Sequence, residues 1–134
     1  MPKLNLFLSS ESPHIDKTVE QLKREIGLTR IEHTRSLKVI LCNLFNYQDK
    51  KILVSRRKNK ISTTKGNPLK IGAKSFISVL DALDRFGLID QKKGKKTDNR
   101  TTSIRTTEEL MIWFDASNWS HDDIDSFNPQ RITL

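Results

Sequence analysis

The fold is decided by residues 71–109, which read IGAKSFISVLDALDRFGLIDQKKGKKTDNRTTSIRTTEE. The first part of this stretch predicts a helix over 73–85, because apolar residues recur there on one helix face, at Phe76, at Val79 or Leu80, and at Leu83. Gly87 stands just past this helix, at the position where glycine commonly ends a helix in a left-handed conformation. The run 88–91 that follows predicts a strand.

The second part of the stretch predicts a basic β-hairpin. Residues 92–100 hold five Lys or Arg and nothing that could be buried, so we expect them to form its exposed tip. Residues 101–106 are rich in β-branched side chains and are expected to form the returning strand. The run Thr106-Thr107-Glu108-Glu109 matches a capping box, which predicts the start of another helix. That helix carries the apolar residues Leu110, Ile112, Trp113 and Phe114.

Two amphipathic helices are expected upstream of this stretch. The first begins at Ser12-Pro13, with proline at its first position, and Gly27 can close it. Its apolar stripe is Ile15, Val19, Leu22 and Ile26. The second opens with the capping box Thr29-Arg30-Ile31-Glu32. Its stripe is His33, Leu37, Ile40, Leu41 and Leu44, then Phe45 or Tyr47, and Cys42 beside the stripe is interpreted as a small buried residue.

The rest of the chain predicts one short strand, a polar segment and a tail. Residues 52–56 are a short β-rich run, and the polar residues 57–71 contain a turn signal at Gly66-Asn67-Pro68. The tail after residue 115 is expected to form a short helix packed back onto the body through Trp119, Ile124 and Phe127. Its acids would at most bind a divalent cation weakly, and an acidic helix start is the favoured interpretation of His121-Asp122-Asp123 and Asp125.

The positive charge of the chain is concentrated in its middle. The 134 residues carry a net charge of +8. By segment, the net charge is +1 over residues 1–49, +12 over residues 50–105 and −5 over residues 106–134. A basic middle of this kind predicts binding to a phosphate backbone, because each neutralised phosphate releases counterions. A solvated basic face without a partner is the alternative interpretation.

The order of helix, glycine corner, strand, basic hairpin and strand resembles winged helix-turn-helix proteins. Residues 71–89 are similar to the recognition helix and first wing strand of that family, above all at Leu83 and Phe86-Gly87-Leu88-Ile89. Asp98-Asn99-Arg100 and the run 106–110 are similar to the wing end and the next helix start. The resemblance implies an α+β, helix-rich fold with a small antiparallel sheet and a basic β-hairpin wing. One departure is that residues 59–70 are polar, where a winged helix has a short helix before the recognition helix.

A second resemblance narrows the class of protein. The runs Leu53–Asn59 and Ser103–Leu110, together with the glycine corner, are similar to the winged-helix N-terminal domains of replication initiators from plasmids, phages and phage satellites. This resemblance implies that the protein recognises repeated or inverted sites in a replication origin as a homodimer. It also implies that further domains bind other replication proteins. The expected organisation is an N-terminal segment with an amphipathic helix over 1–28, a winged-helix DNA-binding domain over 29–115, and an acidic tail over 116–134. Either a further domain beyond the tail or a small repressor that ends there fits this pattern.

Two groups of residues are expected to contact double-stranded DNA. Lys74, Ser75 and Ser78 occupy the outward N-terminal half of the recognition helix, where they would read base edges. Asp81 and Asp84 come later, so we expect the helix to approach DNA with its N-terminal half. The hairpin cations would act as point charges on phosphates: Lys92, Lys93, Lys95, Lys96 and Arg100. The cations of the polar segment complete the expected DNA surface: Arg57, Lys58, Lys60 and Lys65.

Enzymatic, metal-binding and membrane functions are not predicted. A phosphate-loop motif needs four residues between its glycines, whereas six separate Gly87 from Gly94. The chain has one cysteine and three isolated histidines, which are His14, His33 and His121. They can form neither a zinc site nor a pair of nucleophile and base, so we expect no metal, no cofactor and no enzymatic activity. No apolar run approaches the roughly 18 residues of a membrane span, and no signal peptide is recognisable. The single cysteine fits a reducing, cytoplasmic compartment.

Three alternatives to a replication initiator stay open. A winged-helix transcriptional regulator would use the same DNA surface. An RNA-binding module would expose aromatic stacking platforms, but residues 50–105 contain only Phe76 and Phe86, both expected in the core. A protein-interaction winged helix would offer its basic surface to an acidic partner. For each DNA-binding alternative we expect a homodimer. Two amphipathic helices precede the winged-helix domain, and its core need not bury the apolar faces of both, which leaves one for a second copy of the chain.

Overall fold

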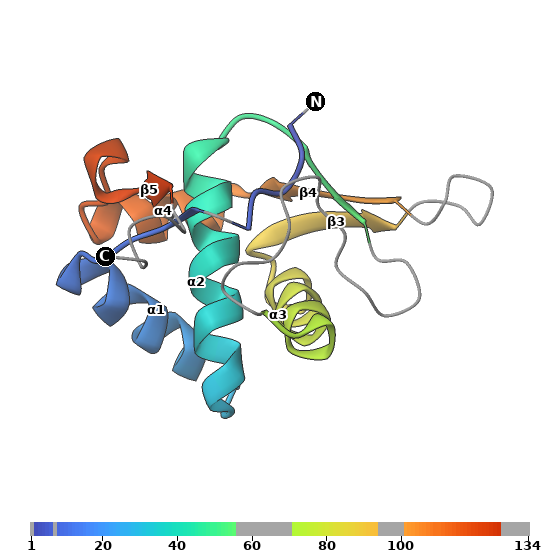
Figure 1. The fold of residues 1–134 in the computed structure, drawn as a ribbon, viewed down its shortest axis with the longest axis horizontal. Helices are drawn as coiled ribbons and strands as arrows, with labels where there is room; N and C mark the ends of the chain where they lie inside the picture. Colours follow the sequence, from blue (N-terminus) through green and yellow to red (C-terminus); the bar gives the residue numbers. More distant parts are fainter. Residues whose placement is uncertain (1, 7, 56–70, 94–100, 127–134) are drawn as a thin grey trace, which may run out of the picture.

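The computed structural model describes residues 2–6, 8–55, 71–93 and 101–126 (Figure 1). This part of the chain contains four α-helices and a three-stranded antiparallel sheet. The fold is α+β and helix-rich, as predicted, and it is compatible with a winged helix. Its elements are β1 (Leu8–Ser9), α1 (Pro13–Glu25), α2 (Ile31–Asn46), β2 (Ile52–Ser55), α3 (Ala73–Arg85), β3 (Ile89–Lys93), β4 (Thr101–Thr106), α4 (Glu108–Ala116), the 3₁₀ turn η3 (His121–Asp123) and β5 (Asp125–Ser126).

Helix α2 is the central element of the core. Figure 1 shows it between α1 on one side and α3 on the other, with the sheet behind it. The predicted stripe of α2 is confirmed at Leu37, Ile40, Leu41 and Leu44, and it is wider than one face because elements pack around the helix. Cys42 is buried, as predicted, and desolvation raises the pKa of its thiol to about 12.

The apolar faces predicted for the neighbouring helices are also confirmed. Helix α1 buries Ile15, Val19 and Leu22, and α3 buries Phe76, Val79, Leu80 and Leu83. Ser12 is the N-cap of α1 and Pro13 its first residue. Both helices end at a glycine with a φ of 74°, Gly27 and Gly87. A side chain there would be strained, so these two glycines fix where the helices stop.

Strand β4 lies in the middle of the sheet, with β2 and β3 paired antiparallel on its two sides. Ile104 of β4 is in register with Ile52 of β2 and with Gln91 of β3. The strand predicted over 52–56 is present over Ile52–Ser55, and Arg56 lies outside the described residues. The strand predicted over 88–91 runs from Ile89 to Lys93. The returning strand has the predicted bounds. Buried isoleucines of the sheet join the helix residues in one core.

The N-terminal residues, to which the sequence assigned no structure, pair with two strands. Lys3 forms a parallel bridge with Leu53 of β2. The N–H of Leu4 donates to the carbonyl of Leu53 at 2.9 Å, and the N–H of Leu53 donates to the carbonyl of Pro2 at 2.9 Å. Further along, β1 pairs antiparallel with β5. The outer edge of β2 is therefore covered by the start of the chain.

A buried asparagine on α2 holds this segment in place. Asn43 is fully buried. Its side chain accepts a hydrogen bond from the Asn5 N–H at 2.8 Å and donates to the Asn5 carbonyl at 2.9 Å. A further donation goes to the carbonyl of Val39 at 2.8 Å, within the helix. A polar side chain in the core is thus satisfied by main chain from 38 residues away.

The predicted capping box of the second helix is wrong. Helix α2 begins at Ile31, its N-cap is Arg30 instead of Thr29, and no side chain caps it. The residues before it are used to end α1, because the N–H of Leu28 donates to the carbonyl of Lys23 at 3.0 Å. The chain then runs extended through Arg30 before the next helix can start.

The predicted cap of the last helix is shifted by one residue. Helix α4 has Thr107 as its N-cap, and the Thr107 hydroxyl accepts from the N–H of Leu110. Thr106 is instead the last residue of β4, where its hydroxyl donates to the carbonyl of Leu44 at 3.3 Å. The Thr107 hydroxyl also donates to the carbonyl of Gly87 at 2.8 Å, which ties the start of α4 to the glycine corner.

The tail packs back onto the body and forms a short helix, as predicted, and this helix is the 3₁₀ helix η3 with its acids in the first turn. Trp119 is buried in an aromatic cluster with Phe45 and Phe114, with ring centroids 4.8 to 5.5 Å apart. Phe127 lies outside the described residues. Buried side chains from 1–28, 29–115 and 116–134 all belong to one core.

Candidate nucleic-acid interface

The predicted recognition helix, α3, presents a polar face to solvent. Its apolar face packs against α2 and β3, which leaves the opposite face outward. Lys74 and Ser78 are exposed there, four residues apart, as predicted. Ile77 and Asp81 share this face and are half-buried. The outward face of α3 therefore carries a cation, an apolar group, a hydroxyl and a carboxylate in succession.

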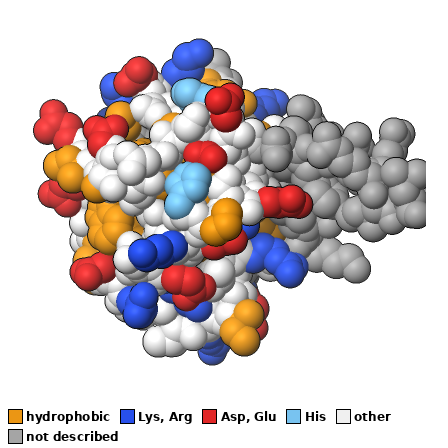
Figure 2. Space-filling view, turned by 90° about the vertical axis from the view of Figure 1, so that its left-hand side faces the viewer, with side chains coloured by type: hydrophobic (Ala, Val, Ile, Leu, Met, Phe, Trp, Pro, Cys, Tyr) orange, Lys and Arg blue, Asp and Glu red, His pale blue; other side chains and the backbone are white. Residues whose placement is uncertain are grey.

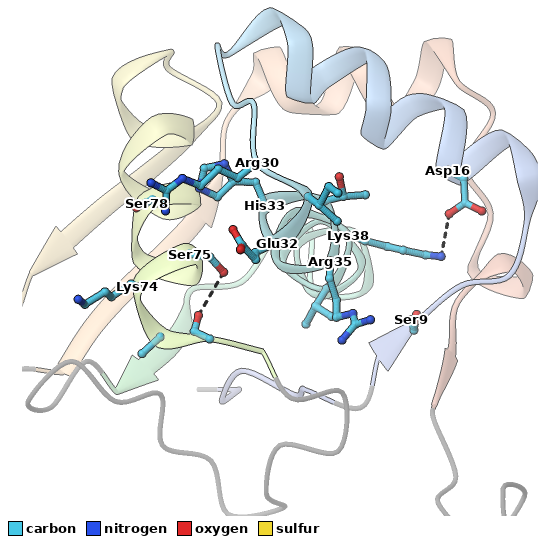
Figure 3. Close-up of a pocket in the computed structure, with 15 residues that line it drawn as sticks. Ser9, Asp16, Arg30, Glu32, His33, Arg35, Lys38, Lys74, Ser75 and Ser78 are labelled. Carbon is cyan, nitrogen blue, oxygen red and sulfur yellow. Dashed lines mark hydrogen bonds and ion pairs between the residues drawn. The ribbon is translucent and has the colours of Figure 1, made fainter.

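Ser75 is oriented differently from the prediction. Its hydroxyl oxygen lies 2.8 Å from that of Ser36 on α2. The same hydroxyl donates to the carbonyl of Gly72 at 3.3 Å (Figure 3). One position along a helix turns a side chain by about 100°, which moves Ser75 from the outward face of α3 to its border with α2. Ser75 thus joins the two helices.

A pocket of about 980 Å³ lies between the N-terminal ends of α2 and α3 (Figure 3). Residues 30–35 and Lys38 of α2 line one wall, and residues 72–75 and Ser78 of α3 line another. Both helices begin without a side-chain cap. Uncapped helix starts carry partial positive charge on their first N–H groups, which favours anions in this pocket.

The side chains of the pocket add to this positive potential. Four cations and two carboxylates line it: Arg30, Arg35, Lys38 and Lys74 against Asp16 and Glu32. The Lys38 ammonium lies 2.7 Å from the Asp16 carboxylate, so these two charges neutralise each other. Desolvation and the nearby Arg30 charge lower the pKa of His33 below its usual 6.5, so this ring adds no charge at neutral pH.

Sequence reasoning missed the contribution of α2. Arg30 and Arg35 lie in a segment that is nearly neutral as a whole, and nothing local connects them with Lys74 more than 35 residues later. The only signal for their role was their place at the start of a predicted helix. It becomes informative once the packing of α2 beside α3 is known.

The two lysines at the end of β3 are both exposed, but they point to opposite faces of the sheet. Gln91 shares a face with Lys93 and contacts α3, because its side-chain amide donates to the Asp81 carboxylate at 3.0 Å. Lys93 therefore continues the surface of α3, whereas Lys92 lies on the other face. The remaining predicted contacts lie outside the described residues: Lys95, Lys96, Arg100, Arg57, Lys58, Lys60 and Lys65.

The expectation that both phenylalanines of the basic segment are buried is wrong for one of them. Phe76 is fully buried, but Phe86 is 47% exposed. Phe86 is the C-cap of α3, just before the left-handed turn at Gly87. The Arg85 guanidinium lies 5.6 Å from the centre of its ring, at cation–π distance.

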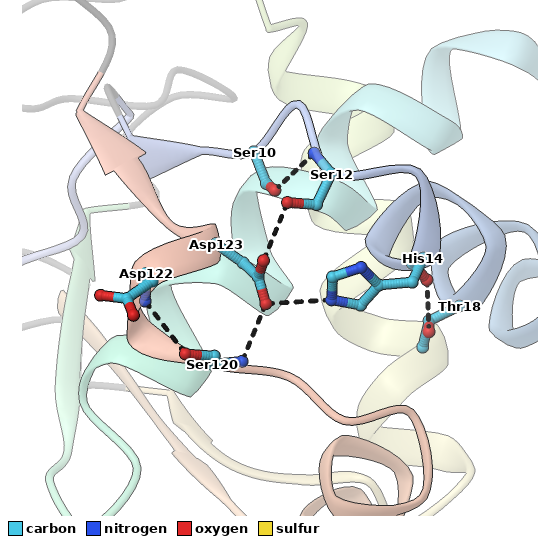
Figure 4. A network of polar contacts seen from close by, with 7 residues as sticks. All are labelled: Ser10, Ser12, His14, Thr18, Ser120, Asp122 and Asp123. Carbon is cyan, nitrogen blue, oxygen red and sulfur yellow. Dashed lines mark hydrogen bonds and ion pairs between the residues drawn. The ribbon is translucent and has the colours of Figure 1, made fainter.

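One acid of the tail, Asp123, is engaged in a polar network with the start of α1 (Figure 4). Oδ1 of Asp123 accepts from the Ser12 hydroxyl at 2.9 Å. Oδ2 accepts from the Ser120 N–H at 3.0 Å and lies 2.9 Å from Nε2 of His14. Desolvation raises the pKa of Asp123, but these hydrogen bonds outweigh it and lower the pKa below its usual range. In the part of the chain that the structure describes, no three His, Cys, Asp or Glu side chains form a group that could hold a metal ion.

The side of the molecule that carries α1, α4 and β5 differs from the pocket. Figure 2 shows acidic and basic side chains interspersed there, with hydrophobic groups between them. Three acids of α4 are exposed around the exposed Ile112: Glu108, Glu109 and Asp115. The described cations that flank α3 thus lie away from the acidic α4.

Comparison with models of known families, with curated proteins and with solved structures finds no match for this chain. Each helix among the described residues is too short or too polar to cross a membrane.

Proposed function

We propose that this protein binds double-stranded DNA with sequence preference, with the outward face of α3 in the major groove. The observation that carries this proposal is that cations lie on both sides of that face. Arg30 lies beside Ser78 on the α2 side of this face (Figure 3), and Arg35 lines the same pocket. Lys93 lies on the face of β3 that contacts α3. A helix that reads base edges needs phosphate contacts on both flanks to fix its position in the groove.

A role as origin-recognition domain of a replication initiator is part of this proposal and is supported by the sequence resemblance. A winged-helix transcriptional regulator would use the same surface, so DNA binding alone does not separate the two roles. The proposed homodimer draws no support from α1 and α2, because the apolar faces that suggested it are buried in the chain's own core. Sedimentation with and without DNA tests it.

A second candidate function is binding to RNA or single-stranded DNA. The exposed ring of Phe86 favours it, because aromatic rings offer stacking platforms to unpaired bases. Phe86 is at the opposite end of α3 from Lys74. The two functions therefore place the nucleic acid at different ends of the helix.

Fluorescence anisotropy with labelled random duplex, single-stranded DNA and RNA tests the proposal. We expect the duplex to bind best and its affinity to fall by roughly 10³-fold or more between 50 and 200 mM salt, as for six or more phosphate contacts. Lys74→Ala should reduce the salt slope by about one. Lys17→Ala is the matched control, since it removes an equal charge from an exposed site on α1 outside the pocket. Equal losses in both variants, or a preference for unpaired strands, would contradict duplex binding by α3.

A further inference from the structure

The outward face of α3 includes a carboxylate in line with the proposed DNA contacts. Lys74, Ser78 and Asp81 follow one another at spacings of four and three residues, which places them along one side of the helix. Net charge alone argues against a carboxylate at a phosphate-rich surface. The structure nevertheless puts Asp81 on the same face as Lys74, so a duplex that reaches one along the groove also meets the other.

Asp81 is held in a fixed orientation by the sheet. The side-chain amide of Gln91 donates to its Oδ1 at 3.0 Å, and Asp81 is half-buried. This bond links the third turn of α3 to β3. A carboxylate has about four acceptor sites, of which the Gln91 amide uses one.

We propose that Asp81 determines base preference by accepting a hydrogen bond from the amino group of cytosine in the major groove; this proposal rests on the duplex binding proposed above. Among base edges in the major groove, cytosine and adenine offer an amino donor, whereas guanine offers only acceptors. The amino group of adenine stands beside the acceptor N7, which a carboxylate cannot bond, so cytosine is the better match. The carboxylate is repelled by the phosphate backbone of any DNA sequence. It therefore favours binding only where a matching base donates a hydrogen bond to it. Asp81 therefore sets preference and lowers general affinity.

The spacing along α3 also predicts the position of this base. Lys74 and Asp81 are seven residues apart, which is about 10 Å along a helix, or roughly three base-pair steps. Lysine pairs with the acceptors of guanine. The preferred site is thus expected to contain a guanine and a cytosine about three base pairs apart, on either strand.

Selection of bound duplexes from a random pool, followed by competition titration with each base at the selected position, tests this proposal. The wild type should prefer cytosine there by roughly tenfold, the size of a good base contact. Asp81→Asn should lose this preference, shift it toward adenine, which asparagine recognises, and bind all duplexes more tightly. Gln91→Ala should weaken the preference without changing the charge. Asp84→Asn is the matched control, because it removes an exposed carboxylate one turn later in α3.

The outcomes separate this proposal from duplex binding itself. If the wild type does not bind duplex, the proposed function fails. If it binds duplex but Asp81→Asn selects the same base, or Asp84→Asn shifts the preference equally, only the role of Asp81 is overturned. Circular dichroism of each variant shows that the fold is kept. A changed preference in Asp81→Asn with unchanged preference in Asp84→Asn supports the proposal.

Discussion

Replacing Asn43 with alanine should detach the N-terminal segment from the core. The side chain of Asn43 satisfies both main-chain groups of Asn5, at 2.8 and 2.9 Å, in a fully buried position. An unsatisfied polar group costs about 1–3 kcal/mol when buried. Asn5 is only half-buried, and its carbonyl also accepts from the Leu8 N–H at 3.3 Å, so the loss should be about 1–3 kcal/mol, mainly from the Asn5 N–H. That is a large share of the roughly 5–15 kcal/mol by which domains of this size are stable.

Urea unfolding followed by circular dichroism measures this loss. The midpoint should fall by about 1–2 M if the slope is typical of a small domain. Hydrogen exchange should also accelerate at Leu4 and Leu53, whose N–H groups bond across this segment. Asn46→Ala is the control, since Asn46 is the last residue of α2 and is half-buried. A loss below about 1 kcal/mol, or equal losses in both variants, would refute the reasoning.

Three further results are expected. Lys93→Ala should lower the salt slope of duplex binding by about one. Lys92→Ala, on the opposite face of β3, should lower this slope less. Equal slopes for the two variants in anisotropy titrations would argue against the proposed placement of the duplex. Asp123→Asn should make the stability of the fold depend less on pH in the acid range. The pKa of Asp123 is lower in the folded protein than in the unfolded chain, so its carboxylate stabilises the fold above the ordinary aspartate pKa. This contribution is lost as the pH falls through the folded pKa. Urea midpoints at neutral and acid pH measure this effect, and parallel losses in both proteins would contradict it. The Cys42 thiol should resist alkylation in the folded protein and react in urea, because it is buried and its pKa is raised to about 12; rapid labelling without urea would contradict its place in the core.

Local patterns were sufficient for much of the fold. Helix α3 could be predicted with its bounds because its apolar period, Gly72 before it and Gly87 after it all lie within a few residues of one another. The N-cap of α4 was predicted one residue too early because Thr106 and Thr107 are both threonines, and either could cap a helix. Only the pairing of β4 and the bond to Leu44 decide between them.

Long-range contacts account for what could not be predicted. The pairing of Lys3 with Leu53 joins two short segments, neither of which specifies a partner. For the same reason, Arg30 could not be placed beside α3 before the packing of α2 was known. Phe86 sits at the end of a helix, where a turn of the chain decides whether an aromatic residue faces the core.

The two halves of α2 tolerate substitution differently. Residues 31–35 line the pocket and are largely exposed, whereas residues 39–45 are all buried. Substitutions in the first half can change the charge of the pocket at little cost in stability, because few packed neighbours must adapt. Those in the second half disturb the core directly. One helix thus separates a part that can vary with the ligand from a part that must be kept, and new binding preferences can arise without a new fold.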